Sequence, residues 1–223
     1  MNRKYKAIIF DLDGTLIDTL SDLANAANRV LTSYGFMIHP RDAYRYFVGC
    51  GVHHLMTTVL PKDQQNNLEL IQRCVDRFLI DYGNNWNVHT KPYTGITDIL
   101  TELKSLGIKL CVFSNKPHEL TQKNVSAFFP ESFFEVVLGQ RSEIPAKPDP
   151  AGVLYISKYL NIPITDILFI GDSSVDMKTA VAANMNSVGV LWGFRDEAEL
   201  RESGAKFIIK HPQEIIELIY RSL

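Results

Sequence analysis

Two carboxylates stand two residues apart near the start of the chain, directly after a short apolar run. Asp11 and Asp13 follow the residues "AIIF", and Gly14 comes next. Two like charges this close disfavour each other's ionised form, which costs stability unless a cation or a proton is shared between them. The pair therefore indicates a site that binds a cation or handles protons, although an acidic turn after a strand accounts for the same residues.

Polar side chains of other kinds follow three further apolar runs. Ser114 and Asn115 come directly after "IKLCVF". Lys147 lies in "AKPDP", beyond the run "FFEVVLG", and Asp172 follows "DILFIG". In a parallel sheet, ligands bind beyond the carboxyl ends of the strands. A hydroxyl, an amide, an ammonium and three carboxylates are therefore predicted to meet at one sheet edge, a set that ordinary turns rarely supply.

Sequence patterns in the second half of the chain predict the elements that must position these side chains. The segments "IKLCVF", "FFEVVLG", "DILFIGD", "SVGVLW" and "AKFIIK" are short apolar runs, typical of strands buried on both faces. Helical stretches alternate with them: Ile96 to Leu106, Pro117 to Phe128, Pro150 to Leu160, Val175 to Ala183 and Pro212 to Tyr220. This alternation predicts an α/β fold with a doubly wound, Rossmann-like parallel sheet, to which "AIIFD" adds a strand.

A purely helical region separates that first strand from the rest. From Thr19 to about Tyr82 the apolar residues recur at helical spacing and no strand pattern interrupts them, which predicts a small helical bundle. We therefore expect a core of residues 1–17 and 92–223 and an inserted helical cap of residues 18–91. The segments "IDTL" and "HTKPYTG" are the expected hinges.

Composition narrows the class of protein. The 223 residues are 46% hydrophobic and 22% charged, with a formal net charge of −2, which is typical of soluble proteins and indicates neither a nucleic-acid nor a membrane partner. The first apolar run is too short for a signal peptide or a membrane span. Cys50, Cys74 and Cys111 have no metal-ligand spacing and are predicted to be reduced core thiols. These features predict a cytoplasmic protein.

Four of the segments above resemble a known family. "DLDGTLID", "FSNKP", "AKPDP" and "GDSSVDM" match, in order and spacing, the four motifs of the haloacid dehalogenase superfamily. The helical insertion after the first motif resembles the cap of its first subclass. The resemblance covers essentially the whole chain and is strongest to phosphoglycolate phosphatases and their relatives. The four motifs are specific for the superfamily and much less specific for one substrate.

The resemblance implies a role for each acid. Asp11 is the expected nucleophile, which forms an aspartyl-phosphate, and Asp13 is the expected general acid and base. Mg²⁺ is the implied cofactor, held by Asp11, the backbone carbonyl of Asp13, and Asp172, with Asp176 behind them. An acid in the first turn of a helix is also favoured by the helix dipole, so a structural role for Asp176 stays open. The Asp11–Asp13 pair is expected to be stabilised by the cation and by Lys147.

The resemblance also implies a phosphate-binding set of Ser114, Asn115 and Lys147. Free N–H groups at a helix start bind phosphate, and Ser114 adds a hydroxyl. The alternative for Ser114 and Asn115 is that they cap the helix that Pro117 opens, since Ser and Asn favour caps and Pro favours the first turn. The alternative for Lys147 is a solvated surface position.

The cap offers a candidate specificity loop in "VGCGVHHLM". Gly49, Gly51 and His53 lie where phosphoglycolate phosphatases carry a glycine-containing loop that faces the active site. Cys50 takes the middle position here, and the following "TTVLP" lacks the arginine found in many relatives. A second carboxylate on the substrate needs a cationic partner. His53 or His54 can supply it, although a histidine pair is also an ordinary helix-surface feature.

The function predicted from these residues is a Mg²⁺-dependent phosphatase acting on a small phosphorylated metabolite of the phosphoglycolate kind. A phosphomutase of the β-phosphoglucomutase type and an inorganic pyrophosphatase share the core motifs and stay as alternatives. A phospho-receiver domain is about half this length and has no inserted cap, and a non-catalytic binding protein is disfavoured because every motif residue is present. We expect a monomer or a homodimer.

Overall fold

Six parallel strands form the central sheet of the computed structural model, which describes residues 4–220. Their order is β5-β4-β1-β6-β7-β8, and every neighbouring pair is parallel. The strands are β1 (Ala7–Phe10), β4 (Lys109–Pro117), β5 (Val136–Gln140), β6 (Ile167–Gly171), β7 (Asn186–Val190) and β8 (Phe207–Ile209). The chain runs outward on one side of β1 and then crosses to the other, which confirms the predicted doubly wound α/β architecture and puts the switch point of the strand order at β1.

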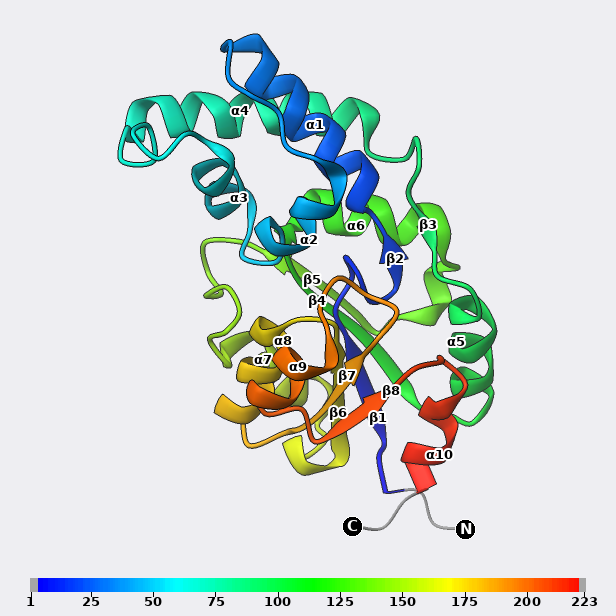
Figure 1. The fold of residues 1–223 in the computed structure, drawn as a ribbon. Helices are drawn as coiled ribbons and strands as arrows, with labels where there is room; N and C mark the ends of the chain where they lie inside the picture. The colour runs from blue at the N-terminus through cyan, green and yellow to red at the C-terminus, as the bar shows by residue number, and fades with distance from the viewer. Residues whose placement is uncertain (1–3, 221–223) are drawn as a thin grey trace.

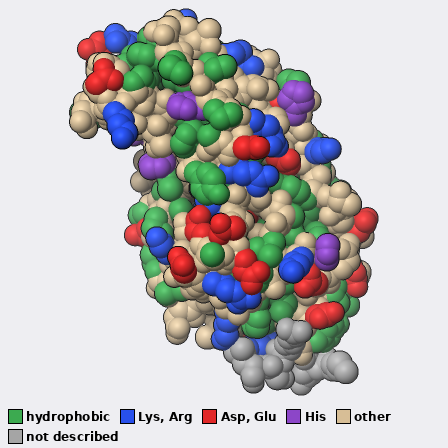
Figure 2. Space-filling view, viewed as in Figure 1, with side chains coloured by type: hydrophobic (Ala, Val, Ile, Leu, Met, Phe, Trp, Pro, Cys, Tyr) green, Lys and Arg blue, Asp and Glu red, His purple; other side chains and the backbone are tan. Residues whose placement is uncertain are grey.

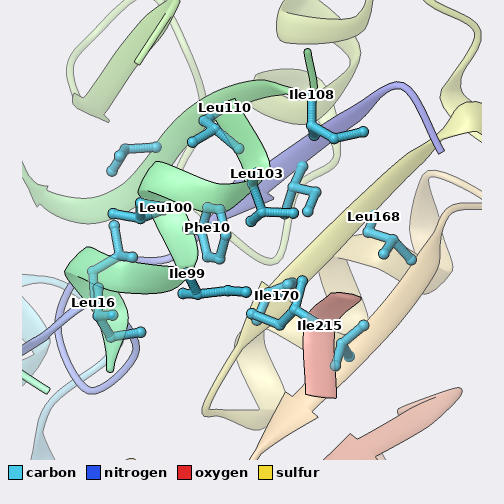
Figure 3. Packing of buried hydrophobic residues seen from close by; sticks show 14 of the residues in the cluster. Phe10, Leu16, Ile99, Leu100, Leu103, Ile108, Leu110, Leu168, Ile170 and Ile215 are labelled. Carbon is cyan, nitrogen blue, oxygen red and sulfur yellow. The ribbon is translucent and has the colours of Figure 1, made fainter. Parts of the chain in front are cut away.

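The continuous apolar run in β1 follows from its central position. All four residues are fully buried, and their side chains alternate between the two faces of the sheet. Ile8 and Phe10 belong to the core on one face, while Ala7 and Ile9 belong to the core on the other. Figure 3 shows the first of these cores, where Phe10 lies beside residues of the helix that covers this face.

Helices cover both faces of the sheet, as Figure 1 shows. Residues of α5 and α10 pack in the Phe10 core, and residues of α7 and α8 pack in the Ile9 core. The helices of this part are α5 (Ile96–Ser105), α6 (His118–Phe128), α7 (Ala151–Leu160), α8 (Ser174–Ala182), α9 (Glu197–Glu202) and α10 (Glu214–Tyr220). Short 3₁₀ turns occupy Glu131–Phe133 and Ile164–Asp166. The predicted helices are confirmed, with ends that differ by one or two residues.

The four helices of residues 20–85 lie together above the sheet in Figure 1. They are α1 (Leu20–Ser33), α2 (Tyr44–Phe47), α3 (Val52–Val59) and α4 (Leu68–Asn85), with a 3₁₀ turn at Arg41–Ala43. Their apolar faces form a hydrophobic core of their own, which residue Phe194 from the sheet part joins. The four helices therefore form a helical part (residues 20–85), which lies over the carboxyl ends of the strands. The six strands and the helices on their two faces are the sheet part.

The two chain segments that connect the helical part to the sheet part pair with each other. β2 (Ile17–Asp18) and β3 (Lys91–Pro92) form a two-stranded antiparallel sheet. These strands lie in the segments "IDTL" and "HTKPYTG", which are the expected hinges. A ladder of two residues has no periodicity that a sequence pattern can show, so the pairing itself was not predicted.

The cysteines correct one expectation. All three are free, and Cys74 and Cys111 are buried as predicted, but Cys50 is exposed. Its position between two glycines of positive φ keeps it in a loop rather than in a packed element.

No helix within residues 4–220 is both long and apolar enough to cross a membrane.

Candidate active site

The carboxyl ends of three neighbouring strands open into one cleft beneath the helical part. Asp11 follows β1, Ser114 and Asn115 lie in β4, and Asp172 follows β6, and all four line this cleft. Residues Gly49 and Gly51, from the loop between α2 and α3, line it from the other side. Figure 2 shows acidic and basic side chains side by side at the middle of the visible face, where the helical and sheet parts meet. The predicted convergence of the strand ends is therefore present in the fold.

Three buried carboxylates form the centre of the site. Asp11, Asp172 and Asp176 each offer an oxygen within 4.8 Å of the others. Burial raises the pKa of Asp11 to about 7, although Lys147 opposes the shift. Burial also raises the pKa of Asp172, and the nearby Asp176 and Asp11 raise it further. Such crowding of acids away from water indicates that a cation is needed to hold them ionised.

Asp172 is held in place by close approach of the backbone. Its Oδ2 accepts a hydrogen bond from Phe194 N at 2.7 Å, and its Oδ1 accepts from Thr15 Oγ1 at 3.5 Å. Gly14 has a φ of +88°, and a Cβ there would lie 2.2 Å from Asp172 Oδ2. The glycine after the second aspartate is thus required both by its backbone conformation and by the position of this carboxylate.

Asp176 is fully engaged by neighbouring groups. Its Oδ1 lies 2.7 Å from Lys147 Nζ, and its Oδ2 accepts hydrogen bonds from Ser173 N at 3.1 Å and Ser173 Oγ at 2.6 Å. Together with Ser173 it forms the capping box that begins α8. The same side chain therefore caps a helix and orients the ammonium that contacts Asp11.

Lys147 is buried among these acids rather than solvated. Its Nζ lies 2.7 Å from Asp11 Oδ1 and donates to Phe113 O at 3.1 Å, besides its contact with Asp176. Burial disfavours the charged form, but the Asp11 and Asp176 carboxylates outweigh it and raise the pKa of Lys147. The ammonium thus contacts two of the three carboxylates, and the group as a whole has a formal excess of negative charge.

Replacing Lys147 with Met is expected to lower the free energy of unfolding by about 3–5 kcal/mol, because Asp11 and Asp176 are left buried without their cation. Urea unfolding followed by circular dichroism, without added Mg²⁺, measures the effect. The matched control is Lys62→Met, the same change at an exposed lysine, which should change the free energy by less than about 0.5 kcal/mol. Equal stability of Lys147→Met and the wild type would contradict this account of the acid cluster.

Asp13 has a different cation from the one expected. The expected partner of the Asp11–Asp13 pair is Lys147, but Lys147 contacts Asp11 alone of the two. Lys116 Nζ instead lies 2.8 Å and 3.0 Å from the two carboxylate oxygens of Asp13 and 3.0 Å from the hydroxyl of Tyr82. Lys116 is buried, and Tyr82 comes from α4 of the helical part. The sequence signal that could have identified Lys116 is its position directly after Ser114 and Asn115 in "FSNKP".

Ser114 and Asn115 do not cap α6, so that alternative is wrong. Pro117 occupies the N-cap position, and no side chain caps this helix. Asn115 Nδ2 donates to Gly49 O and Lys147 O, both at 3.0 Å, and its Oδ1 accepts from Lys147 N at 2.8 Å. The strand β4 continues through both residues, which places their side chains in the cleft and ties Asn115 to the glycine loop.

The loop between α2 and α3 approaches the strand ends closely. Gly49 and Gly51 have φ values of +115° and +87°, and a Cβ on Gly51 would lie 2.9 Å from Gln140 Oε1. His53 and His54 are exposed on α3 and are not among the residues that line the cleft. The structure therefore brings the glycines, but not the histidines, to the acids.

Comparison with known proteins agrees with the resemblance that the four sequence motifs carry. Residues 8–190 match the family model described as haloacid dehalogenase-like hydrolase. The chain is 34% identical to the phosphoglycolate phosphatase of Psychrobacter arcticus over 87% of each chain, and 33% identical to that of Neisseria meningitidis over 90% of this chain and 86% of the relative. A crystal structure titled as a predicted phosphoglycolate phosphatase from Haemophilus somnus superposes with a TM-score of 0.89 at 27% identity, covering 96% of this chain and 98% of the other.

Proposed function

This chain belongs to the haloacid dehalogenase-like hydrolases, and we propose that it is a Mg²⁺-dependent phosphatase that hydrolyses a small phosphate monoester of the phosphoglycolate kind. The observation that carries the proposal is the buried group of Asp11, Asp172 and Asp176 at the switch point of the sheet, with Lys147 in contact with Asp11 and Asp176. The names of the relatives at 34% and 33% identity support the substrate class.

In the proposed reaction Asp11 is the nucleophile. One of its carboxylate oxygens attacks phosphorus, and the bond from phosphorus to the ester oxygen breaks, which gives an aspartyl-phosphate. Asp13, two residues further along the chain, donates a proton to the departing oxygen. Asp13 then accepts a proton from water as the water attacks phosphorus, which releases inorganic phosphate and restores Asp11. The sum is one ester and one water converted to one alcohol and one phosphate.

The donor set of the cleft fits Mg²⁺. Asp11 and Asp172 supply carboxylate oxygens and the backbone of Asp13 supplies a carbonyl, which suits a cation that takes one or two carboxylates and keeps several waters. The three carboxylates and the single ammonium of Lys147 have a formal sum of charges of −2, which one divalent cation neutralises. When bound, Mg²⁺ supplies electrostatic stabilisation of the phosphoryl oxygens.

The remaining phosphate contacts are proposed for Ser114, Asn115 and Lys147. Ser114 lies in β4, the strand beside β1, and the buried ammonium of Lys147 lies 2.7 Å from Asp11 Oδ1. Positioning and charge neutralisation account for most of the catalysis of phosphoryl transfer, so such groups are what the reaction requires. Asp176 serves by holding Lys147 and α8 in place.

We further propose that residues 18–91 are a cap that moves on a core formed by residues 1–17 and 92–223, with the β2–β3 pair as the hinge. Closure of such a cap excludes water and places the Gly49–Gly51 loop over the leaving group. The hydrogen bond from Asn115 Nδ2 to Gly49 O at 3.0 Å supports direct contact between this loop and the phosphate site.

Gly51→Val is expected to lower kcat/KM for phosphoglycolate by about 10- to 100-fold, because the side chain meets Gln140 and the backbone conformation disfavours valine. The Mg²⁺ activation constant should stay within about twofold, since the core sets it. Steady-state kinetics on phosphoglycolate, glucose 6-phosphate and p-nitrophenyl phosphate measure both quantities.

The control for Gly51→Val is Gly35→Val, which introduces the same side chain at a φ of +74° with no atom of the described residues within 4 Å of its Cβ. It should strain the helical part without changing the ratios among the three substrates. An equal fall for all three with Gly51→Val, together with weaker Mg²⁺ activation, would show that the loop supports the core instead of reading the leaving group.

A screen of phosphate esters with the purified protein tests the proposed function. Inorganic phosphate should appear from phosphoglycolate in the presence of MgCl₂, and EDTA should stop its release. Isomerisation of a hexose phosphate without release of phosphate would indicate a mutase, and cleavage of pyrophosphate alone would indicate a pyrophosphatase. We also propose that the protein is cytoplasmic and that it is a monomer or a homodimer. Light scattering measures the molar mass and so distinguishes the monomer from the homodimer.

A further inference from the structure

Arg195 is a cation in the cleft that the proposed reaction does not use. It lies between β7 and α9, in the sheet part, and lines the cleft together with Asp11, Asp13 and Asp172. Among the described residues that line the cleft, the other cation is Lys116, whose ammonium already contacts Asp13 and Tyr82. Arg195 is therefore the cation that remains for a ligand.

Three neighbours hold the guanidinium of Arg195 in one orientation. Its Nη2 donates to Val48 O at 3.0 Å, next to the glycine loop. Its Nε lies 3.3 Å from Glu199 Oε2, and its Cζ lies 5.3 Å from the centre of the Tyr46 ring. The side chain is 10% exposed. A guanidinium fixed in this way presents its remaining donors without a further cost of ordering.

One of those remaining donors has no partner. Arg195 Nη1 is buried and makes no hydrogen bond to any described residue. A buried donor on a charged group is costly to leave unmade, and nearly all such groups in native structures are satisfied by protein, water or ligand. The unpaired Nη1 therefore marks a position where an acceptor belongs.

We propose that Arg195 binds a carboxylate on the alcohol part of the substrate, and so selects a two-carbon phosphate ester that carries a second anionic group. The inference rests on the proposed function and names the cation for its substrate. Three acids line the cleft and repel a carboxylate, so a leaving group of this kind needs a compensating charge. The contact with Val48 puts Arg195 beside the cap loop, on the side where the leaving group is expected.

This assignment supplies a cationic partner for the carboxylate, which the segment "TTVLP" after the glycine loop cannot supply because it has no arginine. The exposed His53 and His54 do not line the cleft. The cation comes instead from the loop after β7, 147 positions after Val48 in the chain. A carboxylate bound there bridges the sheet part and the helical part, because the same guanidinium already donates to Val48.

The test compares two esters with the same two-carbon chain in the presence of MgCl₂: phosphoglycolate, which carries the carboxylate, and ethyl phosphate, which has a methyl group in its place. Arg195→Gln should lower the ratio of their kcat/KM values about 10- to 100-fold, the range expected for one charge-assisted hydrogen bond. Arg195→Lys keeps the charge and should restore part of the ratio. Glycolate, as a probe of the carboxylate site alone, should inhibit the wild type more strongly than Arg195→Gln.

The matched control is Arg45→Gln. Arg45 also joins the two parts, since its Nη1 donates to Gly193 O at 3.0 Å, but it does not line the cleft. Its ratio of kcat/KM values should equal that of the wild type. Thermal melts of all variants report on folding.

The outcomes separate the two proposals. If the wild type hydrolyses both esters and Arg195→Gln lowers both by the same factor, Arg195 only joins the two parts and the inference is overturned while the proposed function stands. If Arg195→Gln does not fold, a loss of the ratio in Arg195→Lys supports the inference, and an unchanged ratio with unchanged glycolate inhibition overturns it. A wild type that hydrolyses neither ester overturns both proposals.

Discussion

Asp11→Asn is expected to reduce turnover by at least about 10⁴-fold, because the amide cannot attack phosphorus and no aspartyl-phosphate can form. The fold should persist, since the change removes one of three crowded acids and Lys147 keeps its contact with Asp176. Steady-state release of phosphate from phosphoglycolate, at saturating MgCl₂, measures the loss. A thermal melt without Mg²⁺ measures the effect on stability.

The control for Asp11→Asn is Asp42→Asn, the same change at an exposed carboxylate, which should leave turnover unchanged. Mass spectrometry of the variant before and after the assay excludes reversion to aspartate by deamidation. Multiple turnovers at more than about one hundredth of the wild-type rate, with deamidation excluded, would show that Asp11 is not the nucleophile.

Asp13→Asn is expected to reduce kcat for phosphoglycolate by about 10²- to 10⁴-fold, the range for loss of a general acid and base. The loss should be smallest for p-nitrophenyl phosphate, whose leaving group needs no proton. The measurement is kcat for a series of phosphate esters with leaving groups of different pKa, in wild type and variant. A steeper dependence on the leaving-group pKa in the variant is the expected signature.

An equal loss across that series would contradict the acid role and would leave Asp13 with its backbone contact to the cation alone. The variant also takes the carboxylate away from Lys116, which is buried. A melt is therefore needed to show that the protein is folded under assay conditions. Lys116→Met separates the two effects, because it removes the ion pair and keeps the carboxylate of Asp13.

Much of the fold could be predicted from local pattern. The strands of the sheet are short continuous apolar runs because both of their faces are buried, and the helices between them have a periodic apolar face, so each element has a sequence signature of its own. The positions of Asp11, Ser114, Asn115 and Asp172 followed, because parallel strands place their carboxyl ends at one edge. The resemblance of the four motifs then supplied the roles proposed for these residues.

The partners of the acids depended on the tertiary structure. Lys116 and Lys147 both stand beside candidate site residues in the sequence, and no local pattern tells which ammonium meets Asp11 and which meets Asp13. The tertiary structure decides this pairing. β4 continues past Phe113 and carries Lys116, whereas the loop before α7 returns to the sheet and carries Lys147. Tyr82, which completes the Lys116 contacts, comes from a helix whose docking the periodicity of α4 does not specify.

The cap side of the cleft shows the same limit. Gly49, Gly51 and His53 are close neighbours in the sequence, yet the loop turns the glycines toward the strand ends, while the start of α3 carries His53 out to solvent. Arg195 is distant from that loop in the chain and shows no motif, so only the docking of the helices on the sheet reveals it as a cleft residue. Elements are encoded by nearest neighbours and periodicity, whereas the pairing of charges across elements is decided by packing, which brings together residues that the chain keeps far apart.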